Sequence, residues 1–234
     1  MTPELCLLPS PLLGPACWQP VAALLPAHGW RVCELPASPA APRTGADALD
    51  AFLSIVPDDR DSILVAHSNA GLFVPLIAAA RKRVTGYVFA DAGLPAPGPG
   101  QVPMIPSRFY DMLAGLADDT GTLPAWTRWW DDEDLSGLFP SAQVRALVEG
   151  EQRQLPLSYF AETLPVPEAW PARRGAYLAF GDGYAAEHAV ATALGWATRV
   201  IDGEHLHMLV DPPALAAAIA RLAAGISRHD AQAP

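Results

Sequence analysis

Short apolar runs alternate along this chain with longer stretches in which apolar residues recur at helical spacing. A short apolar run bounded by turn residues is typical of a buried strand, and the helical spacing predicts a helix that covers it. The predicted strands are 5–8, 32–35, 62–66, 84–90, 177–180 and 198–201. The predicted helices cover about 18–25, 46–56, a stretch that starts near 69, 185–194 and 212–224.

This order of elements predicts an α/β fold with a six-stranded, mainly parallel sheet and helices on both of its faces. In such sheets, ligands bind beyond the carboxyl ends of the strands, so functional residues are expected in the turns that follow strands. Those turns hold Pro9-Ser10-Pro11, His67-Ser68-Asn69, Asp91, Gly181-Asp182-Gly183 and Gly203-Glu204-His205.

A segment of different character interrupts the alternation. A stretch rich in proline and glycine, residues 93–106, marks its start, and helical spacing follows at 109–116 and at 141–149, with no strand pattern between. We expect a helical insertion over the strand ends. Three tryptophans in it are candidate substrate contacts, although packing between insertion and core explains them equally well: Trp126, Trp129 and Trp130.

Composition and charge exclude several classes of function. With 51% apolar and 17% charged residues, the chain has enough apolar material for a large core, and its net charge of −10 repels nucleic acid and anionic membranes. The sequence has no run of about 18 apolar residues and no basic segment followed by an apolar one at its start, which predicts a cytoplasmic protein. No phosphate-binding glycine motif follows a strand, so no cofactor is expected. The expected partner is a small-molecule substrate, and the expected assembly is a monomer or a homodimer.

The cysteines give no sign of a metal site or a disulfide framework. Cys6, Cys17 and Cys33 are odd in number, lack C-x-x-C spacing and lie in or beside apolar runs. This pattern favours buried, reduced thiols.

The sharpest local signal is an apolar strand that ends in a serine and leads into a helix, residues 63–71. This stretch resembles the nucleophile elbow of the α/β-hydrolase family, in which a strained turn projects the serine hydroxyl above the sheet. Ala66 and Ala70 stand where that family has glycine, and Gly71 lies one place further on. The alternative is a structural serine, Ser68, that caps the helix beginning at Asn69.

A nucleophilic serine needs a base and a carboxylate, and the family order Ser, Asp, His is met by Ser68, Asp182 and His205. The stretch 202–212 resembles the histidine loop of small esterases of the plant salicylate-methylester type. This resemblance selects His205 as the base and leaves His207 as a packing or supporting residue. A metal site at the His-x-His pair is disfavoured because no third ligand is evident.

The acid has two further candidates besides Asp182, the residue that the family position favours. Glu187 lies on the following predicted helix, and Asp91 ends an earlier strand, where some relatives place the acid. For Asp91 the structural alternative is a side chain that binds turn amides.

The oxyanion hole departs from the family pattern. One donor is the backbone N–H of Asn69, and the second comes from the loop after the first strand, where relatives carry His-Gly-x. Here Pro11 stands at the donor position and has no N–H. Loss of one such donor costs about 2.7 to 4 kcal/mol of transition-state stabilisation. Either the Leu12 amide donates, or the Ser10 hydroxyl does, or no acyl-type oxyanion forms.

The resemblance therefore implies an α/β-hydrolase fold with a core of residues 1–97 and 172–226, a helical cap of residues 98–171 and a flexible tail of residues 227–234. The antiparallel hairpin that usually opens this fold is expected to be absent. The implied function is a serine hydrolase for a small, largely apolar ester, thioester or lactone.

Two alternatives remain. A lyase or cyclase would use the serine and histidine as proton shuttles, and Ser10 supports it, although Leu206 stands where the related plant hydroxynitrile lyases have lysine and the sole lysine is Lys82. The other alternative is a ligand-binding protein without turnover.

Overall fold

The computed structural model of this chain describes residues 2–35, 41–168, 170 and 174–230. Its central feature is a five-stranded sheet in the order β1-β2-β3-β6-β7, in which each neighbouring pair is parallel. The strands are β1 (Glu4–Leu8), β2 (Ser62–Ser68), β3 (Val84–Ala92), β6 (Arg174–Phe180) and β7 (Ala197–Ile201). Every residue of β1 and β2 is buried, as expected of parallel strands covered on both faces.

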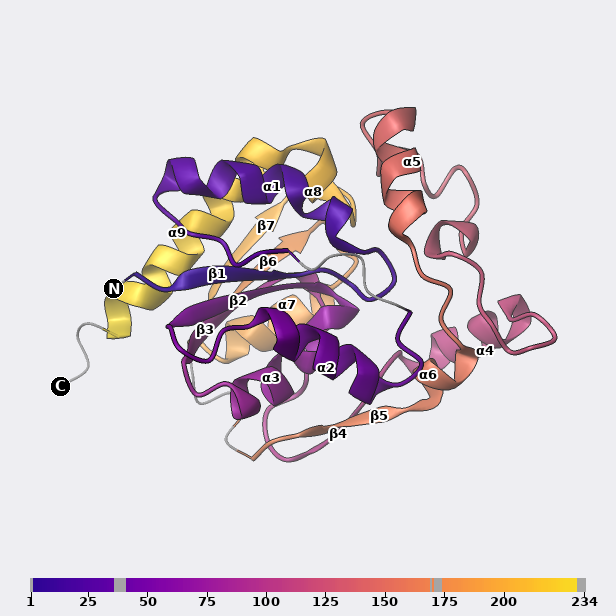
Figure 1. The fold of residues 1–234 in the computed structure, drawn as a ribbon, viewed down its shortest axis with the longest axis horizontal. Coiled ribbons are helices and arrows are strands. Elements are labelled where there is room, and N and C mark those ends of the chain that lie inside the picture. The colour runs from indigo at the N-terminus through magenta and orange to yellow at the C-terminus, as the bar shows by residue number, and fades with distance from the viewer. Residues whose placement is uncertain (1, 36–40, 169, 171–173, 231–234) are drawn as a thin grey trace.

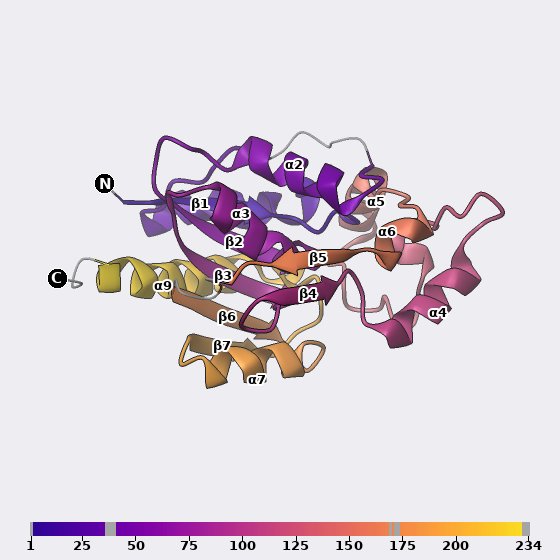
Figure 2. The same cartoon turned by 90° about the horizontal axis from the view of Figure 1, so that it is seen from below.

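Helices cover both faces of this sheet, as the sequence predicts (Figures 1 and 2). One face carries α1 (Gln19–Leu24) and α9 (Pro212–Asp230), and the other carries α2 (Gly45–Ile55), α3 (Val74–Ala80) and α7 (Ala185–Ala193). Shorter helical turns are η1 (Pro15–Cys17), η2 (Leu25–His28), η3 (Asn69–Phe73) and α8 (His207–Val210). None of the helices in the described part of the chain is long and apolar enough to cross a membrane.

The last helix is longer than expected. It runs to Asp230, four residues into the segment that the sequence assigns to a flexible tail, and residues 231–234 lie outside the described part. Ile226 is buried, and its side chain lies against Gly86 of β3, so close that a Cβ on that glycine would be 2.4 Å away. This contact holds the last turns of α9 on the sheet.

One predicted strand, residues 32–35, does not form. Within the described residues it is reduced to a single parallel bridge between Val32 and Leu5, so the sheet has five strands where we expected six. Two hydrogen bonds accompany this bridge, from Leu5 N–H to Arg31 O (2.8 Å) and from Cys33 N–H to Leu5 O (2.8 Å). The apolar run ends at a proline in the sequence, and proline supplies no N–H to continue a ladder.

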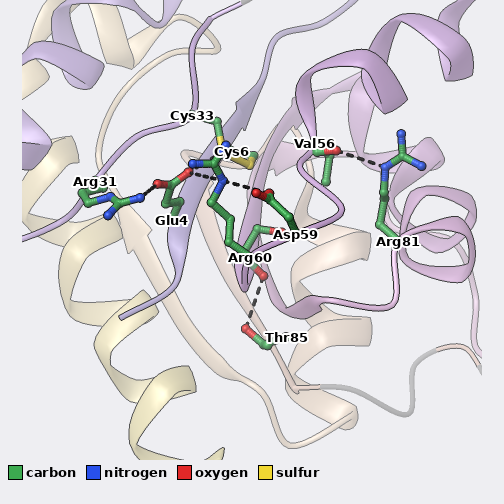
Figure 3. Close-up of a disulfide and its surroundings, with 10 residues drawn as sticks. Glu4, Cys6, Arg31, Cys33, Val56, Asp59, Arg60, Arg81 and Thr85 are labelled. Atoms are coloured by element: carbon green, nitrogen blue, oxygen red, sulfur yellow. Dashed lines mark hydrogen bonds and ion pairs between the residues drawn. A yellow bond between two sulfur atoms is a disulfide. The ribbon is translucent and has the colours of Figure 1, made fainter. Parts of the chain in front are cut away.

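The expectation of three reduced cysteines is wrong for two of them. Cys6 of β1 and Cys33 form a disulfide with their Cα atoms 4.9 Å apart (Figure 3), whereas Cys17 is free and buried. The bridge at Val32 places the two cysteines on neighbouring backbones, which sequence spacing does not reveal. Disulfides are typical of oxidising compartments, so this pair is at odds with the cytoplasmic location that the sequence predicts.

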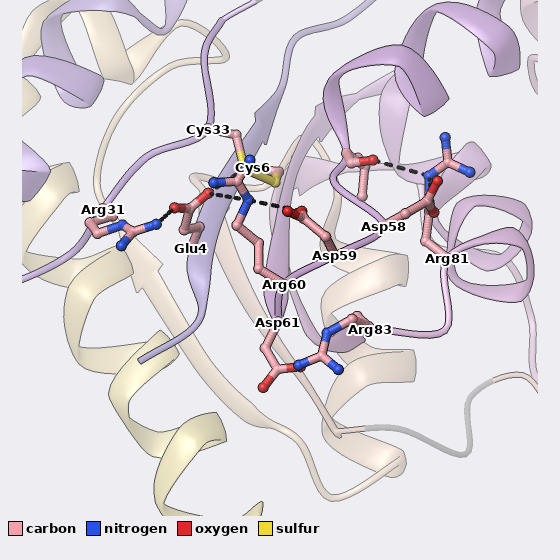
Figure 4. A network of polar contacts seen from close by, with 11 residues as sticks. Glu4, Cys6, Arg31, Cys33, Asp58, Asp59, Arg60, Asp61, Arg81 and Arg83 are labelled. Carbon is pink, nitrogen blue, oxygen red and sulfur yellow. Dashed lines mark hydrogen bonds and ion pairs between the residues drawn. A yellow bond between two sulfur atoms is a disulfide. The ribbon is translucent and has the colours of Figure 1, made fainter. Parts of the chain in front are cut away.

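A network of charged side chains surrounds the amino ends of β1 and β2 (Figure 4). These ends lie at the edge of the sheet opposite the carboxyl ends of the strands. Glu4 is buried and pairs with Arg31 on one side and Arg60 on the other, the latter at 3.5 Å. Two arginines thus compensate the burial of one carboxylate. Neighbouring pairs are Arg60 with Asp59, Arg83 with Asp61, and Arg81 with Asp58.

The segment between β3 and β6 places its helices beyond the carboxyl ends of the strands in both views (Figures 1 and 2). It contains α4 (Ser107–Leu116), η4 (Trp126–Arg128), α5 (Ala142–Glu151) and α6 (Leu157–Ala161). Contrary to expectation it also contains strands, because β4 (Gly100–Pro103) and β5 (Thr163–Val166) pair antiparallel. The two stretches that connect this segment to the core therefore pair with each other as strands. Local periodicity in the sequence does not indicate such a long-range pairing.

The disulfide between Cys6 and Cys33 is expected to stabilise the folded chain. It closes a loop with a sequence separation of 27 residues, so reduction is expected to lower the free energy of unfolding by about 2 to 4 kcal/mol in urea titrations. A Cys33→Ser variant should unfold at the same urea concentration with and without reductant. In denaturant without reductant, thiol titration should find Cys17 alone; finding all three thiols free would contradict the pairing.

Candidate active site

Ser68 occupies a strained turn at the end of β2. Its backbone angles are φ 57° and ψ −131°, a region that residues with a side chain rarely adopt. The turn is tightly packed, since a Cβ on Gly71 would lie 2.1 Å from the carbonyl oxygen of Gly93. Gly93 in turn donates its N–H to Ser68 O at 3.0 Å. Gly71 stands one position after the place where the α/β-hydrolase pattern has glycine. Because it has no side chain, the turn can lie in close contact with the backbone of Gly93.

A second strained residue lies at the end of the neighbouring strand β3. Asp91 has φ 47°, and among the described residues it and Ser68 are the two non-glycine residues with positive φ. Strain of this kind costs about 1 to 3 kcal/mol per residue and concentrates at functional sites. Its coincidence at two adjacent strand ends marks this place as a candidate site.

His205 is bound by Asp91. His205 Nδ1 lies 2.7 Å from Asp91 Oδ2, and the other carboxylate oxygen accepts the N–H of Phe180 at 3.0 Å. A carboxylate can only accept, so Nδ1 carries the proton and Nε2 is the nitrogen left to act as a base. Asp91 is 1% exposed, and the side chain of His205 is 21% exposed. His205 is therefore held from the interior and reachable from outside.

The preferred acid of the sequence analysis is not in contact with this histidine. Asp182 is exposed in the loop after β6, where its carbonyl accepts the N–H of Ala185. Glu187 lies half-buried in the first turn of α7. The structure brings His205 to Asp91, the third candidate, because Asp91 lies near the end of β3 beside β6 and its carboxylate reaches both Phe180 N–H and His205 Nδ1.

Glycines shape the two loops that follow β6 and β7. Gly181 has φ 62°, and a Cβ there would be 2.9 Å from the carbonyl oxygen of Gly203. A Cβ on Gly203 would be 2.3 Å from the ring of His207, which also packs against Phe180 at 5.9 Å. His207 therefore lies in the packing behind the loop of His205. No group of three candidate metal ligands occurs among the described residues.

His67, the residue before Ser68, contacts the backbone of the loop that holds His205. Its Nε2–H donates to the carbonyl of His205 at 2.9 Å, and the two rings are 4.5 Å apart. Its Nδ1 is buried without a hydrogen-bond partner in the described structure. Burial, and then the neighbouring His205, hold the pKa of His67 well below its ordinary value. The sequence indicates His67 only as a member of the turn His67-Ser68-Asn69.

Aromatic side chains flank His205. Tyr184, from the loop after β6, stacks on its ring at 5.7 Å with an interplanar angle of 21°, and Trp126 lies at 5.9 Å. Burial raises the pKa of Tyr184 well above its ordinary value. Sequence reasoning missed Tyr184, although it directly follows the turn Gly181-Asp182-Gly183, where functional residues are expected.

The three predicted substrate contacts separate in the structure. Trp126 faces His205, and Trp130 packs edge-on against Trp126 at 6.0 Å. Trp129 instead packs against Phe160 of α6 and donates its ring N–H to a backbone carbonyl of the same segment at 2.9 Å. Two of the tryptophans are thus near the site, and one belongs to the interior of the inserted segment.

The side chain of Asn69 ties the elbow to the inserted segment. Its amide nitrogen donates to the carbonyl of Met104 at 2.8 Å, and its amide oxygen accepts the hydroxyl of Tyr159 at 2.9 Å. Tyr159 is fully buried in α6. Two hydrogen bonds thereby fix the position of Asn69, whose backbone N–H is the expected oxyanion donor.

On the other side of Ser68, the predicted donors in the loop after β1 bind each other. Leu12 N–H lies 3.4 Å from Ser10 Oγ, a long and weak hydrogen bond. Both residues are buried. Ser10 and Pro11 also line a cavity of about 460 Å³ beside α2 and the end of α5, and neither Ser68 nor His205 is among its described lining residues.

Several solved structures of similar shape are named as hydrolases or esterases. An extracellular α/β-hydrolase from a Paenibacillus species, described as homologous to Tobacco Salicylic Acid Binding Protein 2, superposes with a TM-score of 0.74 at 18% identity over 94% of this chain and 98% of its own. The chain has the α/β-hydrolase fold. The pyrethroid hydrolase PytH gives 0.70 at 20% identity over 97% and 100%, and an Arabidopsis methylesterase gives 0.68 at 16% over 94% and 98%. No protein-family model and no curated protein sequence matches this chain.

The α/β-hydrolase fold predicted from the elbow is therefore confirmed, with five sheet strands in the described residues. At these identities the similarity establishes the fold alone, so the roles of individual residues rest on the geometry of this site.

The buried imidazole of His67 is expected to make the stability of the folded chain depend on pH. Because its folded pKa is lowered, the unfolded chain binds a proton below about pH 6.5 that the folded chain does not. Stability should therefore fall with decreasing pH in this range, by up to about 1.4 kcal/mol per pH unit from this residue. Urea unfolding between about pH 7.5 and 5.5 should show a smaller loss in His67→Gln than in the wild type. Equal losses would contradict the assignment.

Proposed function

We propose that this protein is a serine hydrolase that cleaves a small, largely apolar ester, thioester or lactone. The observation that carries the proposal is the Asp91–His205 hydrogen bond at the end of a strand adjacent to the strained Ser68. A helix-capping serine does not require positive φ, and a structural aspartate does not require an imidazole partner. Together, these features match the parts of a nucleophile, base and acid.

In the proposed mechanism, Ser68 attacks the substrate carbonyl while its hydroxyl proton moves to Nε2 of His205. Asp91 holds the Nδ1–H tautomer and stabilises the imidazolium, the role that the sequence analysis gave to Asp182. His205 then gives the proton to the leaving group. A water molecule, activated by the same nitrogen, releases the acyl group from Ser68.

The oxyanion is proposed to be bound from two sides of β2. Asn69 supplies a backbone N–H from the start of η3, where the first N–H groups of a helical turn have no intrahelical partner. Leu12 supplies the second, by exchanging its weak hydrogen bond to Ser10 Oγ for one to the oxyanion. Pro11 is then a neighbour of the donor and not the donor itself.

The substrate class follows from the surroundings of His205. Trp126 and Tyr184 flank the ring, and Trp130 extends the aromatic wall behind Trp126. These walls favour an apolar substrate, and the inserted segment takes part in them through Trp126. Hydrolases of similar fold include an enzyme named for pyrethroids and a methylesterase, which supports an ester as the substrate.

The direct test is covalent labelling of Ser68. A fluorophosphonate probe should label the wild type at Ser68, as located by peptide mass spectrometry, and should not label Ser68→Ala. Labelling should be lost in His205→Ala as well, since the hydroxyl then has no base. A wild type that stays unlabelled under conditions that label a known esterase would exclude the proposed nucleophile.

A matched pair of variants tests the acid. Asp91→Asn should lower the labelling rate by roughly a thousandfold to ten-thousandfold, because the amide favours the wrong histidine tautomer. Asp182→Asn, the exposed control, should stay within about threefold of the wild type. The reverse order of effects would return the role to Asp182.

A further inference from the structure

Asp91 is an extra residue in the pairing of β3 with β2. His67 of β2 pairs with Ala90 of β3, and the next residue of β2, Ser68, pairs with Ala92. Asp91 is left over between these two pairs, and it forms a bulge at the position where φ is 47°. A bulge of this kind redirects a side chain. On the other side of β3, the pairing with β6 ends at Ala90, so the regular ladders stop just before the proposed acid.

Beyond Ala90, side chains make the hydrogen bonds between β3 and β6. The carboxylate of Asp91 accepts the N–H of Phe180 at 3.0 Å. In the opposite direction, the hydroxyl of Tyr177 in β6 accepts the N–H of Ala92 at 3.2 Å and donates to the carbonyl of the same residue at 2.6 Å. That N–H belongs to the peptide bond between Asp91 and Ala92. One phenol therefore holds the backbone on the carboxyl side of the bulge.

The ring of Tyr177 is itself held by packing. It is fully buried, it stacks on Phe89 at 6.2 Å with an interplanar angle of 5°, and it meets His188 of α7 edge-on at 6.1 Å. Phe89 is also the residue opposite Tyr177 in the pairing of β3 with β6. The hydroxyl is therefore kept at the carboxyl end of this strand pair, where Ala92 lies.

We infer that Tyr177 is a positioning residue of the proposed hydrolase, which keeps the carboxylate of Asp91 on Nδ1 of His205 by holding the backbone of the bulge. The inference rests on the proposed function. Without this hydroxyl, the peptide bond after Asp91 could rotate and its left-handed backbone could relax toward ordinary angles. The carboxylate would then turn away from the two N–H groups that it accepts. Because the phenol binds Ala92, its effect on the reaction passes through Asp91.

The charge state of the tyrosine suits this role. Burial, and then the charge of Asp91, raise the pKa of Tyr177 well above its ordinary value. The phenol therefore stays neutral and keeps the proton that it donates to the carbonyl of Ala92. Buried backbone groups need hydrogen-bond partners, and at Ala92 this hydroxyl satisfies both the N–H and the carbonyl.

The first test is the rate of fluorophosphonate labelling of Ser68. Tyr177→Phe keeps the ring between Phe89 and His188 and removes only the hydroxyl. It should lower the second-order rate constant about tenfold to a hundredfold, the scale expected when a group at the reaction centre is slightly misplaced. The loss should appear in the limiting rate at saturating probe and not in the probe concentration that gives half of that rate, because the hydroxyl binds the strand and not the probe.

A double-mutant cycle separates positioning from general destabilisation. In an Asp91→Asn background, measured at higher probe concentration, adding Tyr177→Phe should change the rate constant by less than about threefold, since the carboxylate through which the phenol acts is already absent. Losses that multiply in the double variant would mean that Tyr177 acts independently of Asp91, and they would overturn the inference. The matched control is Tyr87→Phe, which removes a phenol from the buried stretch of β3 that packs on Trp170 and should label at the wild-type rate.

A second measurement needs no probe. Proton NMR follows the hydrogen on Nδ1 of His205, which its bond to Asp91 shifts to low field, and His205→Ala identifies this signal by removing it. The signal should be present in the wild type and in Tyr87→Phe, and lost through exchange with water in Tyr177→Phe. Retention of the signal, or labelling at the wild-type rate, in Tyr177→Phe overturns the inference and leaves the proposed function standing. A wild type that is not labelled overturns the proposed function, while the NMR comparison still decides whether Tyr177 holds Asp91 on His205.

Discussion

Parallel pairing of β2 and β3 holds two residues with left-handed backbone angles at adjacent strand ends, and the site depends on this constraint. Ser68 and Asp91 each adopt a conformation that an isolated chain avoids. The ladder that pairs the two strands continues to their ends, and Gly93 N–H closes on Ser68 O just beyond it. The strain persists because the sheet on one side and the packed turn at Gly71 on the other leave no relaxed alternative.

From this constraint the rest of the site follows. Asp91, turned by its backbone, presents one oxygen to the amide of Phe180 in β6 and the other to His205 after β7. One carboxylate thereby spans from its own strand to two further elements. The loop after β6, where the family resemblance places the acid, instead brings Tyr184 onto the ring of His205.

What the sequence predicts well is what local patterns determine. Buried parallel strands read as apolar runs, and the elbow and the histidine loop are contiguous motifs, so the sheet, Ser68 and His205 could be placed from the residues alone. What it predicts poorly depends on contacts between distant segments. The bond between His205 and Asp91, the Cys6–Cys33 pair and the antiparallel ribbon of β4 and β5 each require the register of the folded chain. The apolar run at 32–35 is likewise reduced to a single bridge between Val32 and Leu5, an outcome that its local pattern does not indicate.

The pairing of β4 with β5 has a consequence for how this protein can change over evolutionary time. The segment between β3 and β6 leaves the core and returns to it through one hydrogen-bonded ribbon, so its two ends are already closed on each other. Closing a longer or shorter loop on such a base adds little entropy cost, about 0.6 kcal/mol for each doubling of length. Insertions, deletions or whole replacements within that segment can therefore remodel the walls around a bound molecule while the strand ends beneath keep their geometry. For the proposed hydrolase, the ribbon therefore makes substrate selectivity separable from reactivity.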